Sequence, residues 1–86
     1  MSGYSVTFVR SARKELEALE ANDVKRIMER IEALAGELRP RGCHKLKGEK
    51  HLWRIRIGNY RAIYSVSDET RSIEITGVRH RSEAYR

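Results

Sequence analysis

The sequence predicts a single α+β domain: an N-terminal strand and a two-helix hairpin, followed by an antiparallel meander sheet with the helices packed on one face. Two observations predict it. Apolar side chains recur with helical spacing over much of residues 12–38, whereas they alternate as in strands over residues 52–66. The chain has 86 residues, so residues 1–86 should form one domain, because chains divide into several domains only at larger sizes.

The first half of the chain predicts one strand and two helices. Residues 4–9 alternate in a way that is typical of a short, half-buried strand. Ser11 is the expected N-cap of the first helix. We expect the chain to break at residues 22–23 and a second helix to follow, with Pro40 ending the helical region. The apolar stripe of the second helix comprises Val24, Ile27, Met28, Ile31, Leu34, Ala35 and Leu38.

The second half predicts a meander of three strands. Residues 52–57 alternate, which places Arg54 and Arg56 on the face opposite the apolar side chains. A two-residue turn leads into a return strand over residues 60–66. A polar connection then leads into the last strand, which begins at Ile73. If the apolar face packs on the helices, the arginine face is open.

The net charge of +6 is concentrated in the middle of the chain. Residues 39–61 carry eight Lys or Arg against one Glu, a balance of +7. Residues 1–38 sum to −1 and residues 62–86 sum to zero. Such a concentration is typical of a surface that binds a polyanion, nucleic acid first, although a solvated basic surface is the alternative.

The sequence excludes several other classes of protein and site. No apolar stretch is long enough for a transmembrane helix, and the N-terminus lacks the apolar block of a signal peptide, so we expect a cytoplasmic protein. Cys43 is the only cysteine and cannot form an internal disulfide. The cysteine and the histidines do not have the spacing of zinc ligands, so we expect neither a metal nor another cofactor.

The open face of the predicted sheet is the first candidate site. Arg54 and Arg56 point the same way, and Arg61 lies just across the turn. Guanidinium groups suit phosphate because each offers a planar fork of donors and a permanent charge. No Asp or Glu lies between Lys50 and Asp68 to pair with these arginines. This argues against the alternative that they are exposed strand residues that serve only solubility. We expect Arg61 to hold a phosphate rather than to pack.

The C-terminal run is the second candidate site. Gly77 suggests a bulge that re-aims the residues after it. Arg79, His80 and Arg81 add cationic or titratable groups, and Tyr85 adds a ring able to stack on a base. A frayed tail is the alternative interpretation.

Four short segments, in this order and spacing, resemble the RelE/ParE toxin superfamily, and the RelE branch most closely. They are residues 45–48, 52–61, 63–64 and 77–85. The resemblance covers essentially the whole chain. It implies a RelE-like fold and the toxin of a type II toxin–antitoxin system, neutralised by a cognate antitoxin. The charge map implies that this antitoxin is acidic, and contact with DNA is expected only through the antitoxin complex.

For the RelE branch, the resemblance implies a ribosome-dependent endoribonuclease whose partners are the ribosome and messenger RNA. The family mechanism uses no metal: the ribose 2′-OH attacks the adjacent phosphate and the 5′-oxygen leaves. The resemblance places the catalytic set on Arg54, Arg56, Arg61, Arg79 and Tyr85. The residues expected to bind RNA around them are Lys45, Lys47, His80 and Arg81.

The sequence departs from the family pattern at Arg54 and Arg56, where well-known members commonly have lysine. Arginine does not lose its proton in proteins, so these side chains are expected to stabilise charge rather than to act as bases. Proton transfer then falls to Tyr85, to His80 or to ribosomal groups. Two alternatives stay open: a ParE-like poison of DNA gyrase without nuclease activity, and an inactive RNA-binding relic.

Overall fold

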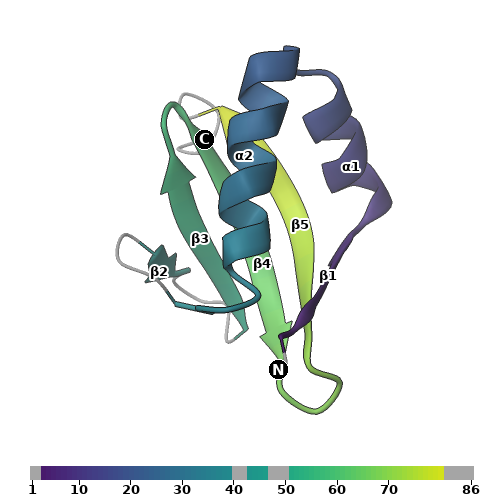
Figure 1. Cartoon of the computed structure of the whole chain (residues 1–86), viewed down its shortest axis with the longest axis vertical. Helices are drawn as coiled ribbons and strands as arrows, with labels where there is room; N and C mark the ends of the chain where they lie inside the picture. Colours follow the sequence, from purple (N-terminus) through teal and green to yellow (C-terminus); the bar gives the residue numbers. More distant parts are fainter. Residues whose placement is uncertain (1–2, 40–42, 47–50, 81–86) are drawn as a thin grey trace.

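The computed structural model of the chain describes residues 3–39, 43–46 and 51–80. Within these residues, a five-stranded sheet carries both helices on one face (Figure 1), which confirms the predicted fold class. The elements are β1 (Ser5–Phe8), α1 (Arg10–Glu17), α2 (Ala21–Ala33), β2 (Cys43–Lys45), β3 (Leu52–Ile57), β4 (Tyr60–Ser67) and β5 (Ser72–His80). In this part of the chain, neither helix is long and apolar enough to cross a membrane.

The sheet has the strand order β1-β5-β4-β3-β2. Strands β2 to β5 pair antiparallel, which confirms the predicted meander. Strand β1 instead pairs parallel with β5, with Ser5 opposite Ser72 and Phe8 opposite Ile75. The long connection through both helices and the meander makes this parallel pairing possible. The sheet is therefore mixed, and only its β2–β5 part is antiparallel.

Both helices begin at positions other than those predicted. The N-cap of α1 is Val9 and not Ser11. The backbone N–H of Val9 donates to the carbonyl of Ile75 at 3.0 Å, so strand pairing holds Val9 extended and the helix begins directly after it. Helix α2 has Glu20 as its N-cap, so Asp23 lies in its first turn rather than in a break. An acidic side chain is favourable there because it faces the positive end of the helix dipole.

Two further boundaries differ from the prediction. Helix α2 ends at Ala33, although the apolar stripe continues to Leu38. Strand β2 was not predicted, because its three residues show no apolar alternation. Hydrogen bonding to β3 defines it, with Cys43 opposite Ile55.

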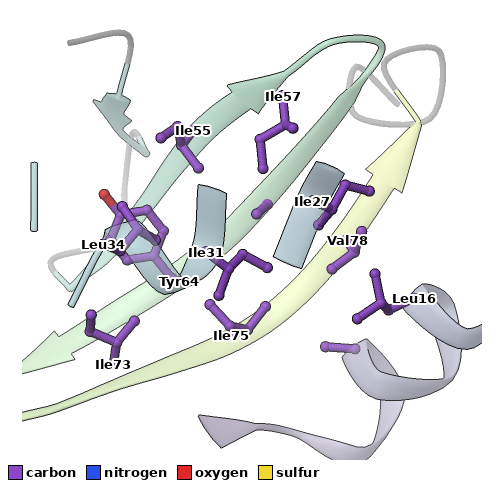
Figure 2. Close-up of a cluster of buried hydrophobic side chains, with 12 residues drawn as sticks. Leu16, Ile27, Ile31, Leu34, Ile55, Ile57, Tyr64, Ile73, Ile75 and Val78 are labelled. Carbon is purple, nitrogen blue, oxygen red and sulfur yellow. The ribbon is translucent and has the colours of Figure 1, made fainter. Parts of the chain in front are cut away.

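The hydrophobic core lies between the helices and one face of the sheet (Figure 2). Leu16 of α1 and Ile31 of α2 face strand residues such as Ile75 and Val78. The buried hydrophobic residues are Ala12, Leu16, Ile27, Ile31, Leu34, Ile55, Ile57, Ala62, Tyr64, Ile73, Ile75 and Val78. Within the described part of the chain, both helices lie on this face and no helix lies on the opposite face of the central strands.

Tyr64 contributes the one phenol of this buried set, and its hydroxyl is held inside the molecule. The hydroxyl donates a hydrogen bond to the carbonyl of Leu38 at 2.7 Å, which ties the segment after α2 to the sheet. Burial raises the pKa of Tyr64 well above its ordinary value, because a phenolate would be poorly solvated there, and Cys43 adds to the shift.

We expect Tyr64→Phe to lower the free energy of unfolding by about 1 kcal/mol at neutral pH, because one buried hydrogen bond is lost. The raised pKa means that the folded state keeps its proton to higher pH than the unfolded chain. The contribution of Tyr64 is therefore complete below about pH 10 and is lost as the pH rises further, by up to about 1.4 kcal/mol per pH unit.

Urea denaturation of the parent and of Tyr64→Phe at neutral and alkaline pH measures both effects. The alkaline decline should be shallower in the variant. Identical declines in the two proteins would contradict this account of the Tyr64 hydroxyl.

Candidate functional site

Three arginines form a row across the open face of the sheet. Arg56 of β3 is the direct cross-strand partner of Arg61 of β4, and Arg61 is the direct partner of Arg79 of β5. Each is flanked along its strand by a residue of the buried core: Ile57, Ala62 and Val78. Because successive strand residues point to opposite faces, the three arginines point away from the helices. Direct partners have Cβ atoms about 5 Å apart, so the row is compact.

Arg54 extends this group by one step along β3. It lies two residues before Arg56 and therefore on the same face, and it is half-buried. Its partner on β2 is His44, whose side chain is exposed. His44 was not predicted as a site residue, because only the register of the unpredicted strand β2 brings its imidazole next to this arginine.

Arg61 is the most buried member of the row, at 9% exposure, and its Nη1 atom has no contact with solvent. The expectation that Arg61 does not pack is therefore wrong. The reason is its place on β4, between two strands that both carry arginine at the same level. A guanidinium shielded from water attracts an anion more strongly than an exposed one, so burial adds to its suitability for phosphate.

A bulge in β5 turns Arg79 to the open face. Ile63 pairs with Gly77 while the next residue, Tyr64, pairs with Ile75, so Thr76 is the extra residue of β5. Before the bulge, the odd-numbered residues of β5 point into the core, and after it the even-numbered ones do. The bulge suggested by Gly77 is thus confirmed, and without it Arg79 would point toward the helices.

Gly77 and Glu15 hold the Arg79 side chain in place. The Arg79 guanidinium lies over Gly77, with its Nη2 atom 3.5 Å from the position that a Cβ would take. Arg79 Nε donates to Glu15 Oε2 at 2.9 Å. The backbone N–H of Val78 donates to the other carboxylate oxygen of Glu15, also at 2.9 Å. Glu15 was not predicted as a site residue, because it lies on α1 and is far from Arg79 in sequence.

His80 and Lys45, which we expected to bind RNA, do not lie on the arginine face. His80 pairs with Tyr60 on the helix side, where the two rings meet edge to face at 5.3 Å. His80 also lines a hollow of about 350 Å³ beside α1, together with Glu15. Lys45 is exposed and pairs with Trp53, on the apolar side of β3. The other expected residues lie outside the described residues: Lys47, Arg81 and Tyr85.

Strand alternation explains this separation. Adjacent residues of a strand point to opposite faces, so His80 cannot share a face with Arg79. The structure therefore brings together four of the expected residues on one face: Arg54, Arg56, Arg61 and Arg79. Such an arginine face on a small α+β domain has the charge that suits a polyanionic ligand.

Comparisons with known proteins show the family to which the chain belongs. The family model described as "ParE toxin of type II toxin-antitoxin system, parDE" matches residues 6–85. No curated protein sequence matches the chain. The chain therefore belongs to the RelE/ParE superfamily of type II toxin–antitoxin toxins, which confirms the resemblance seen in the sequence.

Solved structures of RelE toxins share the fold. The archaeal RelE–RelB complex from Pyrococcus horikoshii OT3 matches with a TM-score of 0.80 and 32% identity, over 92% of this chain and 96% of that chain. The RelBE2 complex from Mycobacterium tuberculosis matches with a TM-score of 0.81 and 30% identity, over 92% and 99% of the two chains. The isolated Escherichia coli RelE toxin matches with a TM-score of 0.79 and 26% identity, over 95% and 90%.

Proposed function

We propose that the protein is a toxin that inhibits translation by cutting messenger RNA on the ribosome. The observation that carries this proposal is the row of Arg56, Arg61 and Arg79, with Arg54 beside it, on one open face of the sheet. A flat array of guanidinium groups on adjacent strands suits the phosphate of an extended RNA strand. The similarity to solved RelE toxins over most of the chain supports this branch of the superfamily.

The proposed reaction is a transfer within the RNA strand. The ribose 2′-oxygen forms a bond to the adjacent phosphorus, and the bond from phosphorus to the 5′-oxygen breaks. The products are a 2′,3′-cyclic phosphate and a 5′-hydroxyl. Negative charge accumulates on the phosphate oxygens in the transition state, and strand pairing keeps the arginines together on the face where they can stabilise it. This charge stabilisation is the role we assign to Arg54, Arg56, Arg61 and Arg79.

Two protons must also move: one leaves the 2′-OH and one reaches the departing 5′-oxygen. Arginine cannot accept a proton in this environment, so Arg54 and Arg56 do not serve as the base. His44 lies on this face beside Arg54 and brings an imidazole, a side chain with both a donor and an acceptor nitrogen when neutral. Tyr85 keeps its proposed role in stacking or proton transfer, whereas the position of His80 on the helix side argues against such a role for it.

The partners that we propose for the protein follow from its proposed activity and from the positive charge concentrated in the middle of the chain. The ribosome and messenger RNA are the targets, which places the activity in the cytoplasm. The structures similar to this chain include RelE–RelB toxin–antitoxin complexes, which supports a cognate antitoxin. The balance of +7 over residues 39–61 requires acidic residues in a partner that covers this surface. Such an antitoxin would neutralise the toxin by covering or displacing the arginine face.

A gyrase poison is the second candidate function, because the matching family model carries the ParE description. Expression of the chain in growing cells, followed by mapping of transcript 5′ ends, separates the two. We expect new 5′ ends within translated codons and growth restored by co-expression of the antitoxin. An SOS response with intact transcripts would instead support the gyrase poison, and unchanged growth would support an inactive relic.

The purified protein should cut RNA in the presence of ribosomes and cut free RNA poorly. A site built of arginines lacks a strong base of its own and depends on the ribosome to orient the strand. The measurement compares cleavage of one messenger with and without ribosomes. Equally efficient cleavage of free RNA would contradict the proposed dependence on the ribosome.

A further inference from the structure

The carboxylate of Glu15 joins helix α1 to the free part of the β5 edge. Strand β1 covers this edge only as far as the hydrogen bond from Val9 to the carbonyl of Ile75. Beyond that point the backbone N–H of Val78 points outward, and Glu15 Oε1 accepts its hydrogen bond at 2.9 Å. The second oxygen, Oε2, accepts from Arg79 Nε at the same distance. The Glu15 carboxylate therefore binds the backbone of β5 with one oxygen and the Arg79 side chain with the other.

We propose that Glu15 is a positioning residue that fixes the Arg79 guanidinium for contact with the RNA phosphate. This inference rests on the proposed function, in which Arg79 contacts that phosphate. By binding Nε, Glu15 occupies one edge of the guanidinium and leaves the Nη groups for the ligand, with Nη2 lying over Gly77. The planar fork of arginine can serve two anions in this way.

Because the ion pair between Glu15 and Arg79 is exposed, we expect its main effect to be the orientation of the Arg79 side chain rather than the stability of the fold. The side chains of Arg79 and Glu15 are 44% and 32% exposed, and ion pairs with such access to water add little to stability. An arginine side chain without a partner would, however, populate many rotamers above the sheet. When Glu15 fixes one rotamer of Arg79 before the RNA binds, the side-chain entropy of Arg79 is not lost during binding of the transition state.

Glu15→Gln separates the two contacts of the carboxylate. The amide oxygen can still accept from the Val78 N–H, but the amide NH₂ is a donor and cannot accept from Arg79 Nε. The reversed amide orientation would leave the partly buried Val78 N–H without an acceptor, whereas Arg79 reaches water easily, so the first orientation is favoured. The variant therefore keeps the hydrogen bond from the Val78 N–H and loses the hydrogen bond from Arg79 Nε.

We expect Glu15→Gln to lower the ribosome-dependent cleavage rate about 10- to 100-fold, because a misplaced group loses orientation at the reacting centre. Affinity for the ribosome–messenger complex should be unchanged or higher, because a negative charge has been removed from a cationic surface. The melting temperature should stay near that of the parent. Glu17→Gln is the matched control, because Glu17 lies on the same helix in an exposed pair with Arg13 and should leave cleavage unchanged.

The double variant tests whether Glu15 acts through Arg79. In an Arg79→Ala background, Glu15→Gln should cause no further loss of cleavage. An equal loss in both backgrounds would overturn the inference, and so would a Glu15→Gln variant that cleaves at the parent rate. The NMR resonance of the Arg79 Nε–H should also shift in Glu15→Gln and not in Glu17→Gln. An unchanged resonance would show that the contact is not made in solution.

These outcomes distinguish the inference from the proposed function. A parent protein that cleaves no RNA on ribosomes overturns the proposed function, and with it the role of Glu15 in cleavage. A parent that cleaves, combined with a Glu15→Gln variant that cleaves equally well, overturns only the inference about Glu15.

Discussion

Arg61→Ala is expected to lower RNA cleavage on the ribosome about 100- to 1,000-fold and to abolish growth inhibition. A loss of this size is typical when one fixed donor to a developing negative charge is removed. Arg61 is the middle member of the row and pairs directly with Arg56 on one side and Arg79 on the other. Its replacement therefore removes the group best placed to contact a phosphate held over the centre of the sheet.

The burial of Arg61 requires a second variant. At 9% exposure, Arg61 also fills space between its neighbours, so alanine leaves a void and lowers stability as well. Arg61→Lys keeps the positive charge and most of the volume but loses the planar fork. We expect it to fold like the parent and to retain only part of the activity. Single-turnover cleavage and thermal unfolding, measured on the same preparations, separate activity from stability.

Arg30→Ala is the charge-matched control, because Arg30 is an exposed arginine of α2 on the helix side of the molecule. This variant loses one positive charge away from the row and should cleave like the parent. If Arg61→Lys and Arg61→Ala both cleave at the parent rate, Arg61 does not contact the phosphate, and the arginine row is not the site.

Ile31→Ala is expected to lower the free energy of unfolding by about 2–5 kcal/mol, the range for removal of a large aliphatic side chain from a core. Ile31 is fully buried in α2 and packs between the helices and the sheet (Figure 2). Small domains have only about 5–15 kcal/mol of stability in total, so a single loss of this size removes a large fraction of it. The core is also what fixes the strands whose opposite face carries the arginines.

Chemical denaturation of Ile31→Ala beside Lys25→Ala measures this effect. Lys25 lies on the exposed side of the same helix, and its replacement should change stability by no more than about 0.5 kcal/mol. A loss below about 1 kcal/mol for Ile31→Ala would contradict the central place of Ile31 in the core.

Local patterns in the sequence predicted the fold class and most of the strands. The alternation in residues 52–57 gave both the strand β3 and the face that carries Arg54 and Arg56. The helical stripe identified α2, although its ends were misplaced. Boundaries such as the start of α1 directly after Val9 depend on pairing with β5, a contact that a local window of sequence does not contain.

The family motifs pointed to four arginines that the structure brings to one face, but they did not predict how these arginines pair across the strands. His80 stands next to Arg79 in sequence and was assigned to the same site, yet it points to the helix side. Strand β2 was missed, and with it the position of His44 beside Arg54. Both differences concern the choice of face and partner strand, which depends on register rather than on composition.

The sequence by itself determined the α+β class, the concentration of positive charge and the residue types of an arginine site, because period, charge and propensity are properties of short segments. Only the tertiary structure decided which side chains from different strands and helices meet. The register places Arg56, Arg61 and Arg79 in one row, and the bulge at Thr76 turns the last of them outward. The packing of α1 on β5 brings Glu15 to Arg79 across 64 positions of sequence. Such contacts follow from the burial of the core as a whole, which fixes register by requiring the core side chains of all the strands to face the helices at once.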